Sequence, residues 1–417
     1  MRIRIHRGTA EIGGNCVEIE AGDGQRVIID LGRPLWASSA VDVPLPDAEG
    51  LTHHDPMLCG IVISHPHLDH YGLLGKVSAD VPVFIGAEAS SLLRAASFFS
   101  PVSVAIKPAG YHVHGESSTV GPFTITPYLN DHSAFDAYSL LIQCDGRRVF
   151  YTGDIRGHGR KSRLFEALLA DPPRDVDVML MEGTHVRSDP ATDGETFETE
   201  ADLEMRFVDV LKATSGAVAV LGSAQNIDRL VTVYRAARRS GRQLVVDLYG
   251  ISVAAATRST IPQLGFPDLR VYVPQRQRVL VKDSGEFNRV KELGQARVYA
   301  EELAAAPSRY VFYVPSSVVF ELCRSGVLDS TGAVVWSLWS GYLRDGSGER
   351  LQQFLAERSI PLSTIHTSGH ASVVDLQRLV GAVRPDRLVP MHSGASSRFV
   401  ELFPNVERHD DGEWWDV

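Results

Sequence analysis

Two patterns of hydrophobic and polar residues divide the chain. Up to about residue 195, short apolar runs separated by turn residues predict β-strands, as in RVIIDLG, GIVISHPH and YSLLIQC. Asp145 and Gly146 separate two of these runs and predict a tight hairpin. From Glu195 onward, amphipathic helices alternate with apolar strands such as GAVAVLGS and QLVVDLYG. That alternation is typical of a parallel sheet, so the sequence predicts an α/β protein with a strand-rich first part.

Length and composition are those of a globular protein. The chain has 417 residues, of which 44% are hydrophobic and 22% are charged, and this length suits two or three domains. The first twenty residues alternate like a strand, and no apolar stretch reaches the length of a membrane span. The four cysteines are scattered without a CxxC pair, which argues against disulfides and a thiolate zinc site. We therefore expect a cytoplasmic protein without a membrane partner.

The formal net charge of -10 argues against a protein that coats nucleic acid through bulk positive charge. A local basic surface remains compatible with it. One basic cluster lies in DIRGHGRKSR, and the second follows a predicted helix: Arg229, Arg235, Arg238, Arg239 and Arg242. A solvated helix face and a nucleic-acid-binding surface explain the second cluster equally well.

The stretch VISHPHLDHYG carries the strongest chemical pattern, with three histidines and an aspartate within six positions after an apolar run. In an extended segment, His65, His67 and Asp69 would project the same way, while His70 would turn toward a neighbouring space. That geometry suits two adjacent metal ions. Imidazole and carboxylate ligands without cysteine fit zinc, manganese or similar cations. A catalytic metal site is therefore predicted.

Four other polar residues recur after apolar strands: His132, Asp154, His370 and His392. Each alone is as well explained as a turn or capping residue. Because functional groups of sheet proteins gather at strand ends, their recurrence there favours convergence on one site. Of the remaining histidines, only His158 and His366 stay undecided.

The segment HPHLDH resembles the metal-binding signature of the metallo-β-lactamase superfamily. IGGNCVEIE with VIIDLG resembles its opening hairpin, and the DH and TGD segments resemble two further motifs. Glu182 in MEGTH, His370 in HTSGHAS and His392 in VPMHSG resemble the three motifs of its β-CASP branch, which includes ribonuclease J. GSAQNIDRLV and LWSGYL are similar to segments of the inserted β-CASP domain. The resemblance covers nearly the whole chain.

This resemblance implies a four-layered αββα sandwich, formed by residues 1–195 and 351–417, with an α/β β-CASP domain inserted at residues 196–350. It also implies two divalent ions, zinc or alternatively manganese. One ion would be bound by His65, His67 and His132, the other by Asp69, His70 and His392, with Asp154 bridging them. Asp30 matches the first family motif and would support the ligands without binding metal.

The implied activity is two-metal hydrolysis of RNA, giving 5'-phosphate and 3'-hydroxyl ends. Cleavage inside the RNA and trimming from its 5' end both remain open, as does assembly into a homodimer. Asp69, His370 and Glu182 would be the catalytic residues, with His370 protonating the leaving oxygen or holding a phosphate oxygen and Glu182 orienting it. Ser368 and Gly369 would cradle a phosphate. Only a short tail follows HSGASSRFVELFPNV, so the C-terminal domain of ribonuclease J is not expected.

Other classes of protein share parts of this pattern. A lactamase-fold hydrolase of thioesters or lactones would use the same metal ligands, yet it would not need the roughly 150-residue insertion or the pair His370 and Glu182. A non-enzymatic nucleic-acid-binding module would not need an intact ligand set. A DNA-directed β-CASP nuclease is the third alternative, although the family pattern associates a histidine at His392 with RNA.

Overall fold

The computed structural model describes residues 1–37, 39–100, 104 and 106–417. Its residues form two compact units, which we call unit 1 (Met1–Phe197 and Gly369–Val417) and unit 2 (Glu198–Ser368). The sequence predicted a return to the first part at residue 351. In the structure, α11 (Gly346–Ala356) and β18 (Leu362–Thr364) still belong to unit 2. The reason is that α11 contributes to the core of unit 2 and β18 pairs with β17 (Ala333–Trp336).

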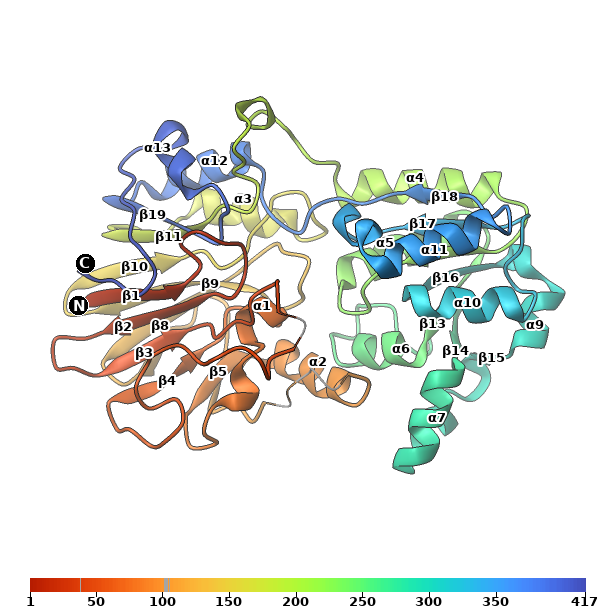
Figure 1. Ribbon diagram of the computed structural model, residues 1–417, viewed down its shortest axis with the longest axis horizontal. Helices are drawn as coiled ribbons and strands as arrows, with labels where there is room; N and C mark the ends of the chain where they lie inside the picture. The colour runs from red at the N-terminus through yellow and green to blue at the C-terminus, as the bar shows by residue number, and fades with distance from the viewer. Residues whose placement is uncertain (38, 101–103, 105) are drawn as a thin grey trace. The chain divides into compact units, whose positions relative to one another are not determined.

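Unit 1 contains two sheets (Figure 1). The first has the order β20 (Trp414–Asp416), β1 (Arg2–Arg7), β2 (Cys16–Glu20), β3 (Arg26–Ile29), β4 (Leu58–Val62), β5 (Val83–Gly86) and β6 (Gly110–His112). The second has the order β19 (Arg387–Met391), β11 (Val178–Glu182), β10 (Arg147–Tyr151), β9 (Tyr138–Cys144), β8 (Phe123–Leu129) and β7 (Ser118–Val120).

Alternating side chains of the second sheet build two hydrophobic layers. Leu140 and Ile142 of β9 face the core between the two sheets, whereas Leu141 faces a helix layer. Three helices form that layer, and Figure 1 shows them beside β19, β11 and β10: α3 (Ser162–Ala170), α12 (Val373–Val383) and α13 (Phe399–Leu402). On the first sheet, α2 (Ala87–Ser97) packs against β5. This order of layers confirms the predicted αββα sandwich.

The predicted hairpin at Asp145 and Gly146 is confirmed. β9 and β10 pair antiparallel on either side of it. Both turn residues adopt left-handed backbone, with φ of 51° for Asp145 and 71° for Gly146. Two-residue turns of this kind match the natural twist of the flanking strands, which is why aspartate followed by glycine predicted the turn.

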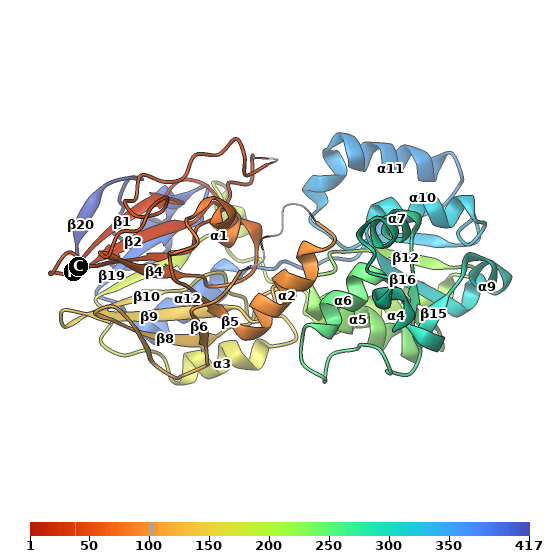
Figure 2. The same cartoon turned by 90° about the horizontal axis from the view of Figure 1, so that it is seen from below.

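Unit 2 contains one parallel sheet with the order β15 (Arg297–Val298), β14 (Leu269–Tyr272), β13 (Gln243–Asp247), β16 (Tyr310–Val314), β12 (Val218–Leu221), β17 and β18. In Figure 2, two groups of helices lie on opposite sides of β12 and β16. One group is α4 (Glu200–Ala213), α5 (Ile227–Arg239) and α6 (Leu248–Ala255), and the other includes α10 (Ser316–Arg324) and α11. Leu303 of α9 (Ala300–Ala305) belongs to the same hydrophobic core as α10 and α11. The remaining helices of unit 2 are α7 (Gln275–Ser284) and α8 (Asn288–Lys291).

Burial divides the second basic cluster of the sequence. Arg229 is fully buried and pairs with Glu200, and Arg242 is buried and donates to the carbonyl oxygen of Gly216 at 2.7 Å. The three arginines that remain exposed each lie within 3.4 Å of a carboxylate: Arg235 and Arg239 pair with Glu204, and Arg238 pairs with Asp268. Two members are therefore structural, and the other three are exposed arginines paired with carboxylates, for which both explanations stay open. Within the described residues, no helix combines the length and apolar character needed to cross a bilayer.

Candidate metal centre

The HPHLDH segment follows β4 and turns into a short helix, α1 (Leu68–Tyr71). Backbone N–H groups of His70 and Tyr71 donate to the carbonyl oxygen of His67, at 2.9 and 3.1 Å. The expectation that Asp69 projects beside His65 and His67 is therefore wrong. Because the chain is helical at Asp69, its carboxylate joins the group around His70 instead.

Three groups of four ligand atoms form at the strand ends of unit 1, and the third, Asp154, Glu182, His370 and His392, shares members with the other two. Within each group the atoms lie within 4.8 Å of one another. The first group is His65, His67, His132 and Asp154, and the second is Asp69, His70, Asp154 and His392. The structure thus brings together all seven side chains predicted as metal ligands, in the predicted division and with Asp154 shared.

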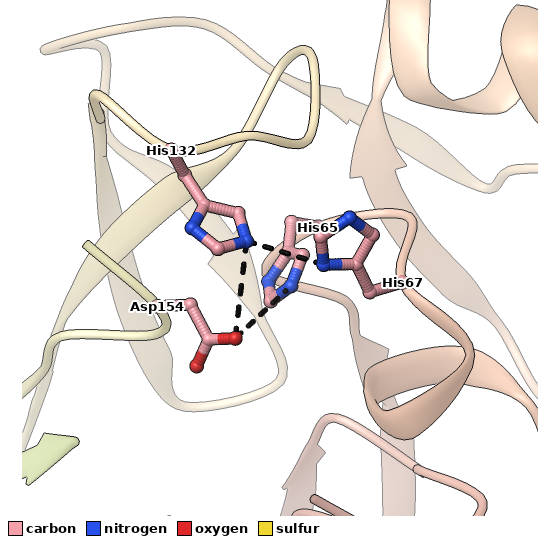
Figure 3. A group of neighbouring side chains, drawn as sticks. All are labelled: His65, His67, His132 and Asp154. Carbon is pink, nitrogen blue, oxygen red and sulfur yellow. Dashed lines mark hydrogen bonds and ion pairs between the residues drawn. The ribbon is translucent and has the colours of Figure 1, made fainter. Parts of the chain in front are cut away.

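Figure 3 shows the first group, whose three imidazole rings and one carboxylate point toward one another. His132 Nε2 lies 3.1 Å from His67 Nδ1, and His65 Nε2 lies 3.5 Å from Asp154 Oδ2. Asp154 Oδ2 is also 3.2 Å from Nε2 of His70 in the second group. The Asp154 carboxylate therefore lies between the two groups. In the second group, His392 Nε2 is 3.3 Å from Asp69 Oδ2.

The donor set fits divalent cations. His65 Nε2, His70 Nε2 and both carboxylate oxygens of Asp154 are buried and have no hydrogen-bond partner among the described residues. Leaving several such atoms unsatisfied in one place is costly, and a cation would satisfy them together. Burial and the neighbouring imidazoles also lower the pKa of His65 well below its ordinary value, which favours the neutral, metal-binding form of that ring.

Asp30 supports the second group through a hydrogen bond to His70, without being one of its four members. It follows β3 with left-handed backbone, φ 59°, and is fully buried. Its carboxylate accepts hydrogen bonds from Ser64 N, Ser64 Oγ, His70 Nδ1 and Tyr151 Oη, each at 2.7 Å. A proton held on Nδ1 leaves Nε2 of His70 as the available lone pair. The sequence did not single out Ser64 or Tyr151. Their only signal is their position, since Ser64 directly precedes His65 and Tyr151 directly precedes the TGD segment.

His370 and Glu182 form a pair beside both groups. His370 Nδ1 lies 3.0 Å from Glu182 Oε2 and 3.7 Å from Asp154 Oδ2. Burial opposes the charged imidazole, but the carboxylates of Glu182 and Asp154 outweigh it and raise the pKa of His370 to about 9. Thr184 was also missed: its Oγ1 lies 3.1 Å from His370 Nδ1 and 2.9 Å from His392 Nδ1. This hydroxyl therefore connects the pair to a predicted metal ligand.

The glycine before His370 is required by close packing. A Cβ at Gly369 would lie 2.6 Å from Ser133 Oγ, too close for any other residue without movement. Ser368, predicted to share a phosphate with Gly369, is the last residue of unit 2. His185, which the sequence left without a role, has its ring centroid 6.4 Å from that of His370.

Known proteins resemble the chain at the levels of domain, sequence and fold. A family model described as a beta-lactamase superfamily domain matches residues 34–226. Ribonuclease J of Sinorhizobium meliloti is 23% identical, over 97% of this chain and 72% of its own length. Ribonuclease J 2 of Streptococcus pyogenes is 24% identical, over 92% and 68%. A solved Enterococcus faecalis protein of unknown function has a TM-score of 0.78 at 20% identity, with 99% of each chain covered.

An αββα sandwich with histidine and aspartate side chains gathered at its strand ends defines the metallo-β-lactamase class of fold. The sequence matches confirm the resemblance to ribonuclease J-like proteins, the β-CASP branch of that superfamily.

Proposed function

We propose that the protein is a metal-dependent ribonuclease that hydrolyses phosphodiester bonds in single-stranded RNA and leaves 5'-phosphate and 3'-hydroxyl ends. One observation carries the proposal: two ligand groups share Asp154, and the hydrogen-bonded pair of His370 and Glu182 lies against them. The similarity to proteins named ribonuclease J supports RNA as the substrate. Hydrolases of small molecules have no evident need for such a pair.

We assign one divalent ion to His65, His67 and His132 and a second ion to Asp69, His70 and His392, with Asp154 between them. When bound, such ions lower the pKa of water toward about 7 and neutralise charge on a phosphate. Nitrogen and carboxylate donors suit zinc, with manganese as the alternative.

The chain's own residues would handle the proton and the orientation of the substrate. Glu182 and Thr184 contact Nδ1 of His370. We assign the opposite ring nitrogen, Nε2, to the substrate. A proton donated from Nε2 to the leaving 3'-oxygen would complete the cleavage. The backbone amides of Ser368 and Gly369 would hold a phosphate oxygen, as polar glycine turns often do.

Metal analysis tests the ligand assignment. Elemental analysis of carefully loaded protein should give two ions per chain, and clearly one ion or none would contradict the assignment. Asp69→Ala should retain the fold and lose hydrolysis because it removes a ligand of the second ion. Wild-type turnover in that variant would show that the reaction occurs elsewhere.

The role of His370 separates a nuclease from a small-molecule hydrolase. His370→Ala should keep both ions and its affinity for RNA, yet lose about 10² to 10⁴ in rate on RNA, the usual contribution of a general acid. Bis(p-nitrophenyl) phosphate has a better leaving group and should be affected much less. Equal losses on both substrates, with metal retained, would instead indicate that His370 positions a phosphate.

Wild-type assays decide between the candidate substrates. RNA and DNA labelled at either end would reveal both the preferred nucleic acid and the choice between internal and 5' cleavage. Rapid hydrolysis of a thioester or lactone, without activity on any nucleic acid, would overturn the nuclease proposal. Cleavage of DNA alone would redirect it to a DNA-directed enzyme.

A further inference from the structure

Unit 2 presents two large aromatic side chains to solvent just after β17. Trp339 is 63% exposed and Tyr342 is 51% exposed. They belong to the segment around the 3-10 helix η5 (Ser340–Arg344), and their rings lie 5.4 Å apart at 88° to each other. Single exposed apolar residues are common on protein surfaces, so the support and surroundings of this aromatic pair must indicate whether it has a ligand.

The Trp339 ring rests on a fixed support. A Cβ at Gly341 would lie 2.2 Å from the ring, so glycine at this position lets the indole lie close to the backbone. The carbonyl oxygen of Trp339 accepts hydrogen bonds from Trp336 Nε1 at 3.3 Å and from the backbone N–H of Tyr342 at 3.2 Å. The ring is therefore packed against Gly341, and the two hydrogen bonds hold the backbone between the aromatic residues in place.

A buried ion pair fixes the start of this segment. Arg229 donates from Nη1 to the carbonyl oxygen of Ser337 at 3.2 Å, and it binds Glu200 through Nε and Nη2 at 3.2 and 3.0 Å. Arg229 and Glu200 are both fully buried. Burying two charges costs free energy. In this position the Arg229 guanidinium also holds the backbone at Ser337, two residues before Trp339.

The segment lies at an edge of the sheet that is suited to ligands. β12 and β17 are neighbouring parallel strands. After β12 the chain enters α5 on one face of the sheet, whereas after β17 it passes through η5 into α11 on the other face (Figure 2). Open α/β sheets bind ligands at the carboxyl ends of neighbouring strands whose connections leave to opposite faces.

We propose that Trp339 and Tyr342 form a platform on which bases of single-stranded RNA stack, an inference that rests on the proposed ribonuclease function. Stacking needs only one open ring face, and it tolerates any base. The exposed residues that follow, Arg344 to Ser347, are polar or glycine, so they do not extend the aromatic pair into a larger apolar patch. Exposed Arg344 can in addition contact the phosphate backbone.

The test measures binding of the full-length, metal-loaded protein to two fluorescent 12-nucleotide probes of RNA phosphorothioate, which resist hydrolysis. One carries normal bases, and the other has abasic riboses. Trp339→Ala should weaken binding to the base-containing probe about tenfold, as expected for the loss of one stacked base. It should not weaken binding to the abasic probe. Trp339→Phe should restore most of the affinity, and Phe287→Ala, which removes another aromatic ring of unit 2 that is 61% exposed, should match wild type.

Thermal unfolding and metal content show whether Trp339→Ala is folded. If it is misfolded, wild type is compared with Trp339→Phe on the two probes instead. Equal binding of wild type and Trp339→Ala, with RNA hydrolysis intact, would refute the platform and leave the ribonuclease function standing. Equal losses by Trp339→Ala on both probes would also refute stacking. A wild-type protein that neither binds nor cleaves RNA would refute the ribonuclease function, and the platform with it. A change in oligomeric state instead of RNA affinity would assign the pair to protein contact.

Discussion

The Tyr151 hydroxyl is predicted to strengthen metal binding by His70, to which it is connected through Asp30. This hydroxyl donates to Asp30 Oδ2 at 2.7 Å, and the same oxygen accepts from His70 Nδ1 at 2.7 Å. Tyr151→Phe deletes one oxygen atom in the core between the sheets and leaves the ring in place. Asp30 then loses one of its donors, and Asn15 Nδ2 loses the tyrosine oxygen as its acceptor, at 3.3 Å.

The structure limits the size of this effect. A hydrogen bond to a charged group contributes about 1.5 to 3 kcal/mol, and removing a residue that supports a metal ligand costs about 10- to 100-fold in metal affinity. Since Ser64 and His70 still donate to Asp30, the lower end applies. We expect a loss of about 1.5 kcal/mol in the free energy of unfolding of the metal-free protein. Metal affinity should fall about tenfold.

Competition with a chromophoric chelator measures the affinity, and denaturant unfolding measures the stability. Tyr138→Phe is the matched control, because Tyr138 is also buried between the sheets and donates to a carboxylate, Asp136, at 2.7 Å. That variant should lose similar stability and keep its metal affinity. If Tyr151→Phe also kept wild-type affinity, the hydroxyl would be only a structural hydrogen-bond donor and the argument through Asp30 would be wrong.

Two further predictions concern unit 2. Arg229→Ala should cost about 3 to 5 kcal/mol of unfolding free energy because it leaves Glu200 buried without its charge partner. Arg235→Ala removes an exposed arginine whose partner, Glu204, still pairs with Arg239, so it should cost less than about 1 kcal/mol in the same denaturant assay. Equal losses would contradict the buried-pair argument. Burial raises the pKa of Asp247 from 3.8 to about 6, so the folded state binds this proton more tightly than the unfolded state. The stabilisation that this proton provides is fully present below pH 3.8 and is lost as the pH rises through about 6. Asp247→Asn should remove a slope worth about 3 kcal/mol across that window, and an unchanged slope would assign it to other groups.

The strand ends were predictable because their pattern is local. Apolar runs followed by His132, Asp154 or His392 placed these side chains at the ends of β8, β10 and β19, where the structure brings them together. The division of the ligands into two groups came from the family resemblance. Strand alternation alone put Asp69 on the wrong side, because it assumed extended backbone where the chain begins α1.

Supporting residues could not be predicted, because their roles depend on contacts that are distant in sequence. Tyr151 lies 121 positions from Asp30, and Thr184 lies 208 positions from His392. Tyrosine and threonine are also common in strands and turns without any such role. The burial of Arg229 was not predicted for a related reason. Helical periodicity gives no sign that Glu200 forms an ion pair with it inside unit 2.

The second sheet explains how residues so far apart can form one site. His392 follows β19, which lies at the end of the sheet order and pairs with β11 in the register that puts Met391 opposite Glu182. That pairing carries His392 to Thr184 and to Asp69, which follows β4 of the first sheet. Cations held by both groups would therefore link the two sheets across their core. A ligand that binds only the folded state stabilises it by about 2.7 kcal/mol at a concentration of 100 times its Kd, so the metal centre would also hold together a unit whose two segments are separated by all of unit 2.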